Sequence, residues 1–164
     1  MILTMTTLAP LMTSDKADWQ TPADLFEQLD AEFEFLVDMA ATFNNSMCAE
    51  YYGPDRSWPL QRDSLQVPWP EEACWVNPPY GRGIGQWVRK AVEEIRRPGG
   101  PSVIVMLVPA RTDTQWWQVA QAAAEIRYLV GRLTFQGAPS AAPFPSALLV
   151  FRRQFPGPYR WTTR

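Results

Sequence analysis

The chain has 164 residues, of which 46% are hydrophobic and 20% are charged. This length suits one ordinary domain, and this composition excludes a disordered chain. No apolar run approaches the ~20 residues that a membrane-spanning helix needs, so we expect no membrane partner. Histidine is absent, which excludes a histidine general base and zinc sites built on histidine.

The expected organisation is a single domain over residues 18–155, with a flexible leader over 1–17 and a short tail over 156–164. No basic segment precedes the mildly apolar first residues, so we expect no signal peptide. Cys48 and Cys74 are then expected to be reduced thiols of a cytoplasmic protein.

The net charge of −2 is unevenly distributed along the chain. Residues 1–81 carry a net charge of −10, and residues 82–164 carry a net charge of +8. This split excludes a globally basic DNA-binding protein and leaves two interpretations open. Either the two halves neutralise each other in the fold, or the second half forms a basic surface that faces a polyanion.

The first predicted elements are a helix and a short strand. A helix begins at Pro22, because Leu25, Phe26, Leu29 and Phe33 fall on one face. An apolar strand over 35–37 follows and ends at Asp38. Proline and charge are frequent over 53–71, which indicates an irregular surface segment.

The middle of the chain carries the strongest periodic signals. Residues 73–76 are predicted to form a buried strand, and the apolar spacing over 84–95 predicts an amphipathic helix. The wholly apolar run over 103–108 is typical of a central strand in a parallel sheet. Strands that alternate with helices in this way predict an α/β domain with a mostly parallel sheet.

The last third is predicted to hold a helix, a hairpin and a final strand. Residues 112–115 fit a capping box that opens a helix through about Ala124. A hairpin is predicted over 126–135 around Gly131-Arg132, and a last strand over 147–151. Ligands of such sheets bind beyond the carboxyl ends of the parallel strands, where Asp38, Asn77 and the 109–111 loop are expected.

The sharpest motif is Asn77-Pro78-Pro79-Tyr80 after the strand over 73–76. Two prolines fix the backbone and remove competing N–H donors. The Asn77 side-chain oxygen and the Pro78 carbonyl can then accept the two hydrogens of a planar exocyclic amine. Both bonds localise the lone pair of the nitrogen, and Tyr80 offers a ring for stacking on a heterocycle. The amine attacks an activated methyl group, so no histidine base is needed.

An ordered set of motifs from Asp18 to about Phe151 resembles the phage-type DNA N6-adenine methyltransferase family. The resemblance implies a Rossmann-like fold with a mostly parallel central sheet and helices on both faces. It also implies an S-adenosylmethionine-dependent enzyme encoded by a phage or prophage and acting on DNA in the bacterial cytoplasm. The matching stretches are residues 19–22, 37–41, Asn44 with Cys48, Asp63 before Leu65, 75–81, 107–114 and 142–147.

The resemblance also implies donor-binding residues, and it requires no metal. An acidic side chain at a strand end suits the amino group or the ribose hydroxyls of the donor, although Asp38 could instead cap the following turn. Asp38-Met39-Ala40-Ala41 replaces the glycine-rich turn of larger amino-methyltransferases, which leaves the donor contacts open. The residues expected around the donor are Gln20, Thr21, Pro22, Asp38, Ala40 and Asp63.

Several residues are candidates for contact with DNA. Phe144 lies between two prolines in a rigid loop, where its ring is expected to be exposed near the pocket. Four tryptophans are instead expected in the core, because they lie on apolar helix faces or in a strand. The basic candidates are Arg82, Arg111 and Arg132, with Arg152 and Arg153, and the four tryptophans are Trp75, Trp87, Trp116 and Trp117.

Other substrates and one other function class remain open. The same pair of acceptors would also suit the amines of cytosine N4, RNA adenine or a glutamine side chain. A catalytically silent DNA-binding protein would instead use only the basic half of the chain. No separate target-recognition domain fits in this length, so sequence specificity is expected to come from the loops 53–71 and 136–146. The recognition sequence and the oligomeric state are not predicted.

Overall fold

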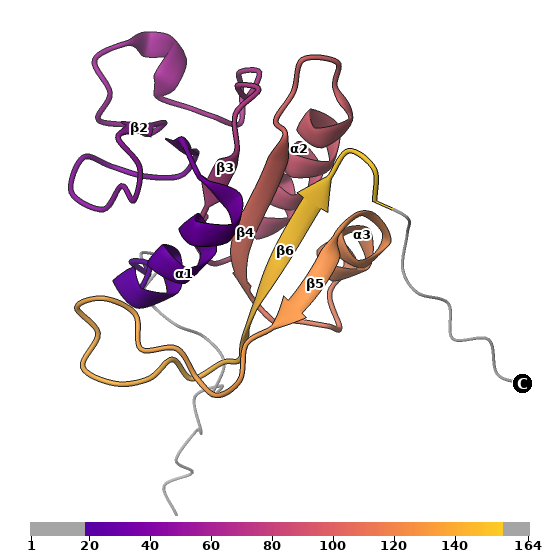
Figure 1. The fold of residues 1–164 in the computed structure, drawn as a ribbon. Coiled ribbons are helices and arrows are strands. Elements are labelled where there is room, and N and C mark those ends of the chain that lie inside the picture. Colours follow the sequence, from indigo (N-terminus) through magenta and orange to yellow (C-terminus); the bar gives the residue numbers. More distant parts are fainter. Residues whose placement is uncertain (1–18, 156–164) are drawn as a thin grey trace, which may run out of the picture.

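The computed structural model describes residues 19–155, and the predicted leader and tail lie outside them. One six-stranded sheet forms the centre of the fold, with the strand order β2-β1-β3-β4-β6-β5 (Figure 1). Only β6 runs against its neighbours, so the mostly parallel sheet is confirmed. The strands are β1 (Val37–Asp38), β2 (Glu50–Tyr51), β3 (Cys74–Val76), β4 (Val103–Pro109), β5 (Glu125–Tyr128) and β6 (Ser146–Arg152).

Helices cover both faces of this sheet, as predicted. The helix α1 (Ala23–Phe33) buries Phe26, Leu29 and Phe33 in a cluster with alternate residues of β4, including Val105. The helices α2 (Ile84–Arg96) and α3 (Gln115–Ala123) pack with the other set of β4 residues on the opposite face. All seven residues of β4 are buried, because both faces of this strand are covered.

Thr114, rather than Thr112, caps α3. The Thr114 Oγ1 accepts a hydrogen bond from the Trp117 backbone N–H at 3.4 Å and donates one to the Arg111 carbonyl at 2.8 Å. The capping box predicted over 112–115 therefore begins two residues too early. The reciprocal partner is missing, because Trp117 stands where a capping box needs Glu or Gln.

This cap gives a first prediction for stability. Thr114→Ala removes the side-chain acceptor at the start of α3 and should lower the free energy of unfolding by about 1 kcal/mol. Thr112→Ala is the matched control and should leave stability nearly unchanged. Urea titrations of both variants and the wild type measure the difference. Equal losses in the two variants would contradict the assignment of the cap.

The predicted hairpin over 126–135 is wrong. β5 pairs with β6 from Glu125↔Val150 to Tyr128↔Ala147, and residues 133–135 form no strand. The physical reason is that β6, a seven-residue strand buried over its first six positions, has a second edge that needs backbone partners. β5 pairs with this edge, and the chain over 129–145 becomes a loop between the two strands.

The irregular segment over 53–71 is present and contains the short 3₁₀ helix η1 (Pro59–Gln61). Its end is anchored by Trp69, which is 1% exposed and donates its backbone N–H to the Glu94 carboxylate on α2 at 3.0 Å. Burial alone would raise the pKa of Glu94. Hydrogen bonds from Lys90, Arg97 and the Trp69 N–H instead hold this pKa below its usual value. The carboxylate therefore stays ionised and ties the segment to α2.

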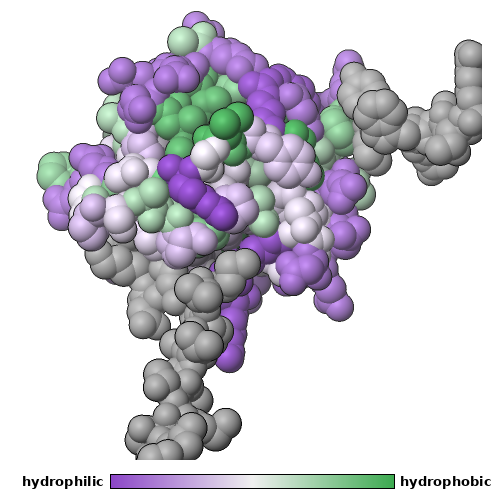
Figure 2. Space-filling model, turned by 90° about the horizontal axis from the view of Figure 1, so that it is seen from below, coloured by the Kyte–Doolittle hydropathy of each residue, from purple (hydrophilic) through white to green (hydrophobic). Residues whose placement is uncertain are grey.

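Figure 2 views the molecule from below, toward the end of the sheet where β4 finishes and β6 begins. Apolar side chains gather there in a patch that polar side chains border.

Among residues 19–155, no helix has the length and hydropathy to cross a membrane. Both cysteines are free thiols, as predicted, and burial raises the pKa of Cys48 to about 12.

Candidate functional site

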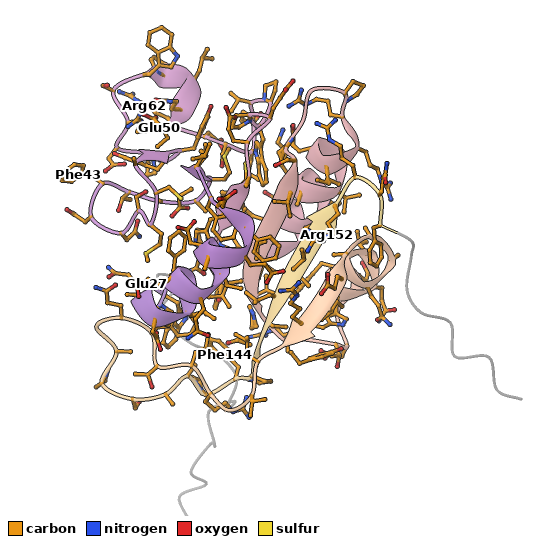
Figure 3. The ribbon with its side chains drawn as sticks, viewed as in Figure 1. Glu27, Phe43, Glu50, Arg62, Phe144 and Arg152 are labelled. Atoms are coloured by element: carbon orange, nitrogen blue, oxygen red, sulfur yellow. The ribbon has the colours of Figure 1, made fainter. Side chains whose placement is uncertain are left out.

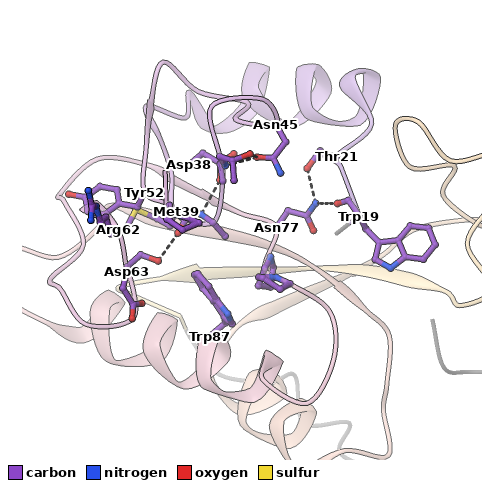
Figure 4. A pocket seen from close by; sticks show the side chains of 18 residues that line it. Trp19, Thr21, Asp38, Met39, Asn45, Tyr52, Arg62, Asp63, Asn77 and Trp87 are labelled. Atoms are coloured by element: carbon purple, nitrogen blue, oxygen red, sulfur yellow. Dashed lines mark hydrogen bonds between the residues drawn. The ribbon is translucent and has the colours of Figure 1, made fainter. Parts of the chain in front are cut away.

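A cavity of about 360 Å³ opens beyond the carboxyl ends of β1 and β3 (Figure 4). This volume lies in the range of small-molecule sites. The cavity brings together residues that the sequence placed in separate motifs. The lining residues are Trp19, Thr21, Asp38, Met39, Ala40, Ala41, Thr42, Asn45, Tyr52, Gly53, Pro54, Arg62, Asp63, Ser64, Asn77, Pro78, Pro79 and Trp87.

The Asn77 side chain is held in one orientation at the cavity wall. Its Nδ2 donates to the Trp19 carbonyl and to the Thr21 Oγ1, the latter at 3.1 Å. A backbone carbonyl can only accept, so the amide nitrogen must face it. The Oδ1 atom points away from both acceptors (Figure 4) and is buried without a partner among residues 19–155. Asn77 therefore presents an oriented, unpaired acceptor.

Asp38 is a buried carboxylate in the same cavity. It is 2% exposed, and its two oxygens accept the backbone N–H groups of Ala40 at 3.2 Å and Met47 at 3.1 Å. Burial raises its pKa to about 6, although these hydrogen bonds lower it. No lysine or arginine within the described part of the chain forms an ion pair with it. Asp38 thus caps the following turn and also leaves lone pairs for a cationic or hydroxyl ligand.

The other predicted donor residues fall inside or beside the cavity. Ala40 and Thr21 line it, and so does Asp63, whose Oδ1 caps a turn by accepting the Leu65 N–H at 3.0 Å. Gln20 and Pro22 lie outside the lining. Gln20 instead forms an isolated β-bridge with Gln136, and Pro22 caps the start of α1.

Tyr80 points away from the cavity into an aromatic cluster. Its hydroxyl group lies 3.4 Å from the Leu107 carbonyl, and its ring contacts the edges of Phe135 and Phe144. The centroid distances are 6.0 Å and 5.7 Å. Burial raises the pKa of Tyr80 above its usual value. In this conformation the Tyr80 ring packs with Phe135 and Phe144 and does not line the cavity, so stacking on a base there would require it to rotate.

The expected exposure of Phe144 is wrong. The ring is only 3% exposed and packs edge-on against Trp19, with centroids 5.5 Å apart. The physical reason is that the loop over 129–145 needs an apolar anchor of its own, and Phe135 and Phe144 supply it. Figure 3 shows Phe144 near the start of β6, at the end of the sheet that carries the site.

The basic candidates divide between the two ends of the sheet. Arg82, Arg111 and Arg132 are exposed in loops that follow β3, β4 and β5. Arg152 pairs in register with Val103 at the opposite end, where it lies 3.8 Å from Glu32. Arg153 donates to the Gly100 and Pro101 carbonyls there. Both residues are therefore removed from the expected DNA-facing surface.

The two oppositely charged halves of the chain contact each other through Glu32. Glu32 belongs to the acidic half and pairs with Arg127 of the basic half at 2.6 Å. Hydrogen bonds from Arg127 hold the pKa of Glu32 below its usual value. The acidic and basic halves thus meet at the β5 edge of the sheet.

Sequence reasoning missed two features of the cavity. Trp75 and Trp117 are core residues as expected, but Trp87 is half-buried and forms a cavity wall beside Asp63 (Figure 4). Gly53, two residues after β2, lies so close to the Ala41 backbone that a Cβ atom there would be 1.6 Å from the Ala41 carbonyl oxygen. A side chain would therefore not fit at this cavity position, and the Gly-Pro pair at 53–54 is its signal in the sequence.

Comparison with known proteins agrees with this architecture. The 23S rRNA methyltransferase ErmE has a similar fold, with a TM-score of 0.54 and 16% identity over 84% of this chain and 70% of that one. The DNA N-6-adenine-methyltransferase of Haemophilus phage HP1 (strain HP1c1) is 26% identical over 128 residues, which are 76% of this chain and 69% of the relative. The DNA N-6-adenine-methyltransferase (Dam) family matches residues 9–164. The chain therefore belongs to the DNA N-6-adenine-methyltransferase (Dam) family.

Proposed function

We propose that the chain methylates the N6 amino group of adenine in DNA, with S-adenosylmethionine as the donor and Asn77 as the main acceptor for the amine. The observation that carries this proposal is the orientation of Asn77. Its Nδ2 donates to two acceptors, and its buried Oδ1 has no hydrogen-bond partner in the described part of the chain. A buried polar atom without a partner is costly, so a functional partner is expected.

The amine of adenine supplies the two donors that this site lacks. One N–H group would donate to the Asn77 Oδ1 and the other to the Pro78 carbonyl. Both bonds pull the nitrogen toward a tetrahedral geometry, which frees its lone pair for attack. Pro79 follows without an N–H that could compete for these acceptors. Because adenine inside a duplex cannot reach this cavity, the base must leave the stack first.

The cavity residues fit the methyl donor. S-adenosylmethionine would supply an electrophilic methyl group on a sulfonium centre. Asp38 is a buried carboxylate that forms no ion pair with a lysine or arginine of residues 19–155, which suits the amino group or the ribose hydroxyls of the donor. Asp63 adds a second acidic side chain, and the flat Trp87 ring lines the wall near it. A metal-free reaction stays a prediction.

The substrate class can be tested directly. A labelled methyl group should pass from the donor to duplex DNA, and not to an RNA of the same sequence or to a glutamine-containing protein fraction. Label on RNA alone would mean that the same amine methylation acts on RNA and not on DNA. Label on no substrate, together with DNA binding, would favour the silent DNA-binding protein.

The exposed arginines at the site end give a prediction for salt dependence. Arg82→Gln, Arg111→Gln and Arg132→Gln should each reduce the log–log salt slope of DNA affinity by about 0.9 where the residue contacts a phosphate. Arg152→Gln, at the opposite end of the sheet, is the control and should leave this slope unchanged. Fluorescence anisotropy across a salt series measures the slopes. An unchanged slope in all three site-end variants would refute this DNA-facing surface.

A further inference from the structure

Thr21 holds the catalytic amide from a distant part of the sequence. It lies 56 residues before Asn77, yet its Oγ1 accepts from the Asn77 Nδ2 at 3.1 Å. Thr21 is 3% exposed, so water cannot readily replace this acceptor. The second acceptor, the Trp19 carbonyl, comes from the same short segment. The two hydrogens of the amide nitrogen therefore both point to residues 19–21.

The segment that supplies these acceptors is itself fixed. The Gln136 N–H donates to the Gln20 carbonyl at 3.0 Å. The centroid of the Trp19 ring lies 4.9 Å from that of Phe135 and 5.5 Å from that of Phe144. Immediately after Thr21, the Pro22 carbonyl accepts the first bond of α1. The segment is thus clamped between α1 and the loop over 129–145, and it cannot follow Asn77 if that side chain turns.

This arrangement matters because an asparagine amide has two nearly isosteric orientations. With Nδ2 toward the cavity, Asn77 would present donors to the adenine amine and repel it. With Nδ2 held by Trp19 and Thr21, the Oδ1 atom stays without a partner among residues 19–155 and is the acceptor that the reaction needs. The two acceptors at 19 and 21 select the second orientation before any substrate arrives.

We infer that Thr21 is a positioning residue that fixes the orientation of the Asn77 amide, rather than a ligand of the methyl donor. This inference rests on the proposed function of Asn77. It reassigns Thr21 from the donor-binding group in which the family resemblance placed it.

The kinetic test compares Thr21→Val with Thr21→Ser. Valine keeps the shape but removes the acceptor, so the single-turnover methylation rate should fall about three- to tenfold. Serine keeps the acceptor and should restore most of the rate. The donor Kd from calorimetry should stay within about twofold in both variants. A donor Kd that rises tenfold in Thr21→Val, with an unchanged rate at saturation, would make Thr21 a donor ligand and overturn the inference.

A double-mutant cycle separates positioning from general damage to the fold. In the Asn77→Ala background, Thr21→Val should have no further effect on the rate, because there is no amide left to orient. The same three- to tenfold loss in that background would contradict the inference. Thr134→Val, at an exposed position, is the control for the substitution itself.

A measurement without turnover keeps the inference apart from the proposed function. The side-chain amide signals of Asn77, identified by their loss in Asn77→Ala, should exchange slowly with solvent in the wild type. They should exchange faster in Thr21→Val and slowly again in Thr21→Ser. Equal exchange in all three proteins would overturn the positioning role, even if the wild type methylates adenine. Slow exchange in a wild type that methylates nothing would instead leave Thr21 as the anchor of Asn77 and refute the proposed function.

Discussion

Replacing Asn77 with alanine should lower the rate of adenine methylation about a hundredfold while the donor affinity stays nearly unchanged. The rate falls because the variant loses the Oδ1 acceptor at the moment when charge develops on the amine. The loss of one such transition-state interaction costs on the order of 3 kcal/mol. Single-turnover assays give the rate, and calorimetry with the donor gives the affinity.

The variant also loses the two hydrogen bonds to residues 19–21, so a structural effect must be measured alongside. Thr21→Val loses one of these bonds but keeps Oδ1, which makes it the matched control. The rate of Asn77→Ala should be at least tenfold below that of Thr21→Val. If Asn77 only closes a turn, the two variants should differ in melting temperature and not in rate. A folded Asn77→Ala protein with the wild-type rate would refute the mechanism.

Donor binding should weaken as the pH falls below about 6, because Asp38 then takes up a proton. Its pKa in the free protein is raised to about 6 by burial. A ligand that bonds to the ionised carboxylate lowers this pKa, so binding favours the deprotonated form. The affinity should therefore be constant above pH 7 and fall about tenfold per pH unit below 6. Calorimetry between pH 4.5 and 8 measures this dependence.

Asp38→Asn is the control, with two expected results. It should bind the donor about 1–3 kcal/mol more weakly at pH 7, with little dependence on pH. The ligand-free variant should nevertheless gain stability over the wild type as the pH rises from 3.8 to about 6, and keep that gain at higher pH. A raised folded pKa means that ionised Asp38 opposes folding, by about 3 kcal/mol at pH 7 for a shift from 3.8 to about 6. A wild-type affinity that stays flat down to pH 5 would remove Asp38 from the donor site.

Periodicity was sufficient for the long elements of the fold. The apolar spacing after Pro22 and after Gly83 predicted α1 and α2 closely, and the apolar run at 103–108 predicted the buried strand β4. These patterns are set by burial, which acts on every turn or every second residue. Thr112 and Thr114 show the limit of such patterns, because two similar caps stand two residues apart and only the backbone geometry separates them.

Long-range pairing could not be predicted in the same way. β2 has two residues and leaves no periodic signal, and the residues of β6 that pair with β5 lie 19 to 25 positions further along the chain. Phe144 illustrates the same limit, because its burial depends on Trp19 and Phe135 rather than on its neighbours.

Only part of the site could be predicted from the sequence, for a related reason. The predicted strand ends placed Asp38 and Asn77 at the same end of the sheet, because the carboxyl ends of parallel strands lie together. The link between Thr21 and Asn77 and the Trp87 wall arise from tertiary packing. No local spacing reports these contacts.

The most direct test of the central claim is nucleoside analysis of duplex DNA after incubation with the wild-type protein and a donor labelled on its methyl group. The account predicts label in N6-methyladenine, and a loss of about a hundredfold with Asn77→Ala. Label in N4-methylcytosine alone, or N6-methyladenine formed equally well by Asn77→Ala, would contradict it.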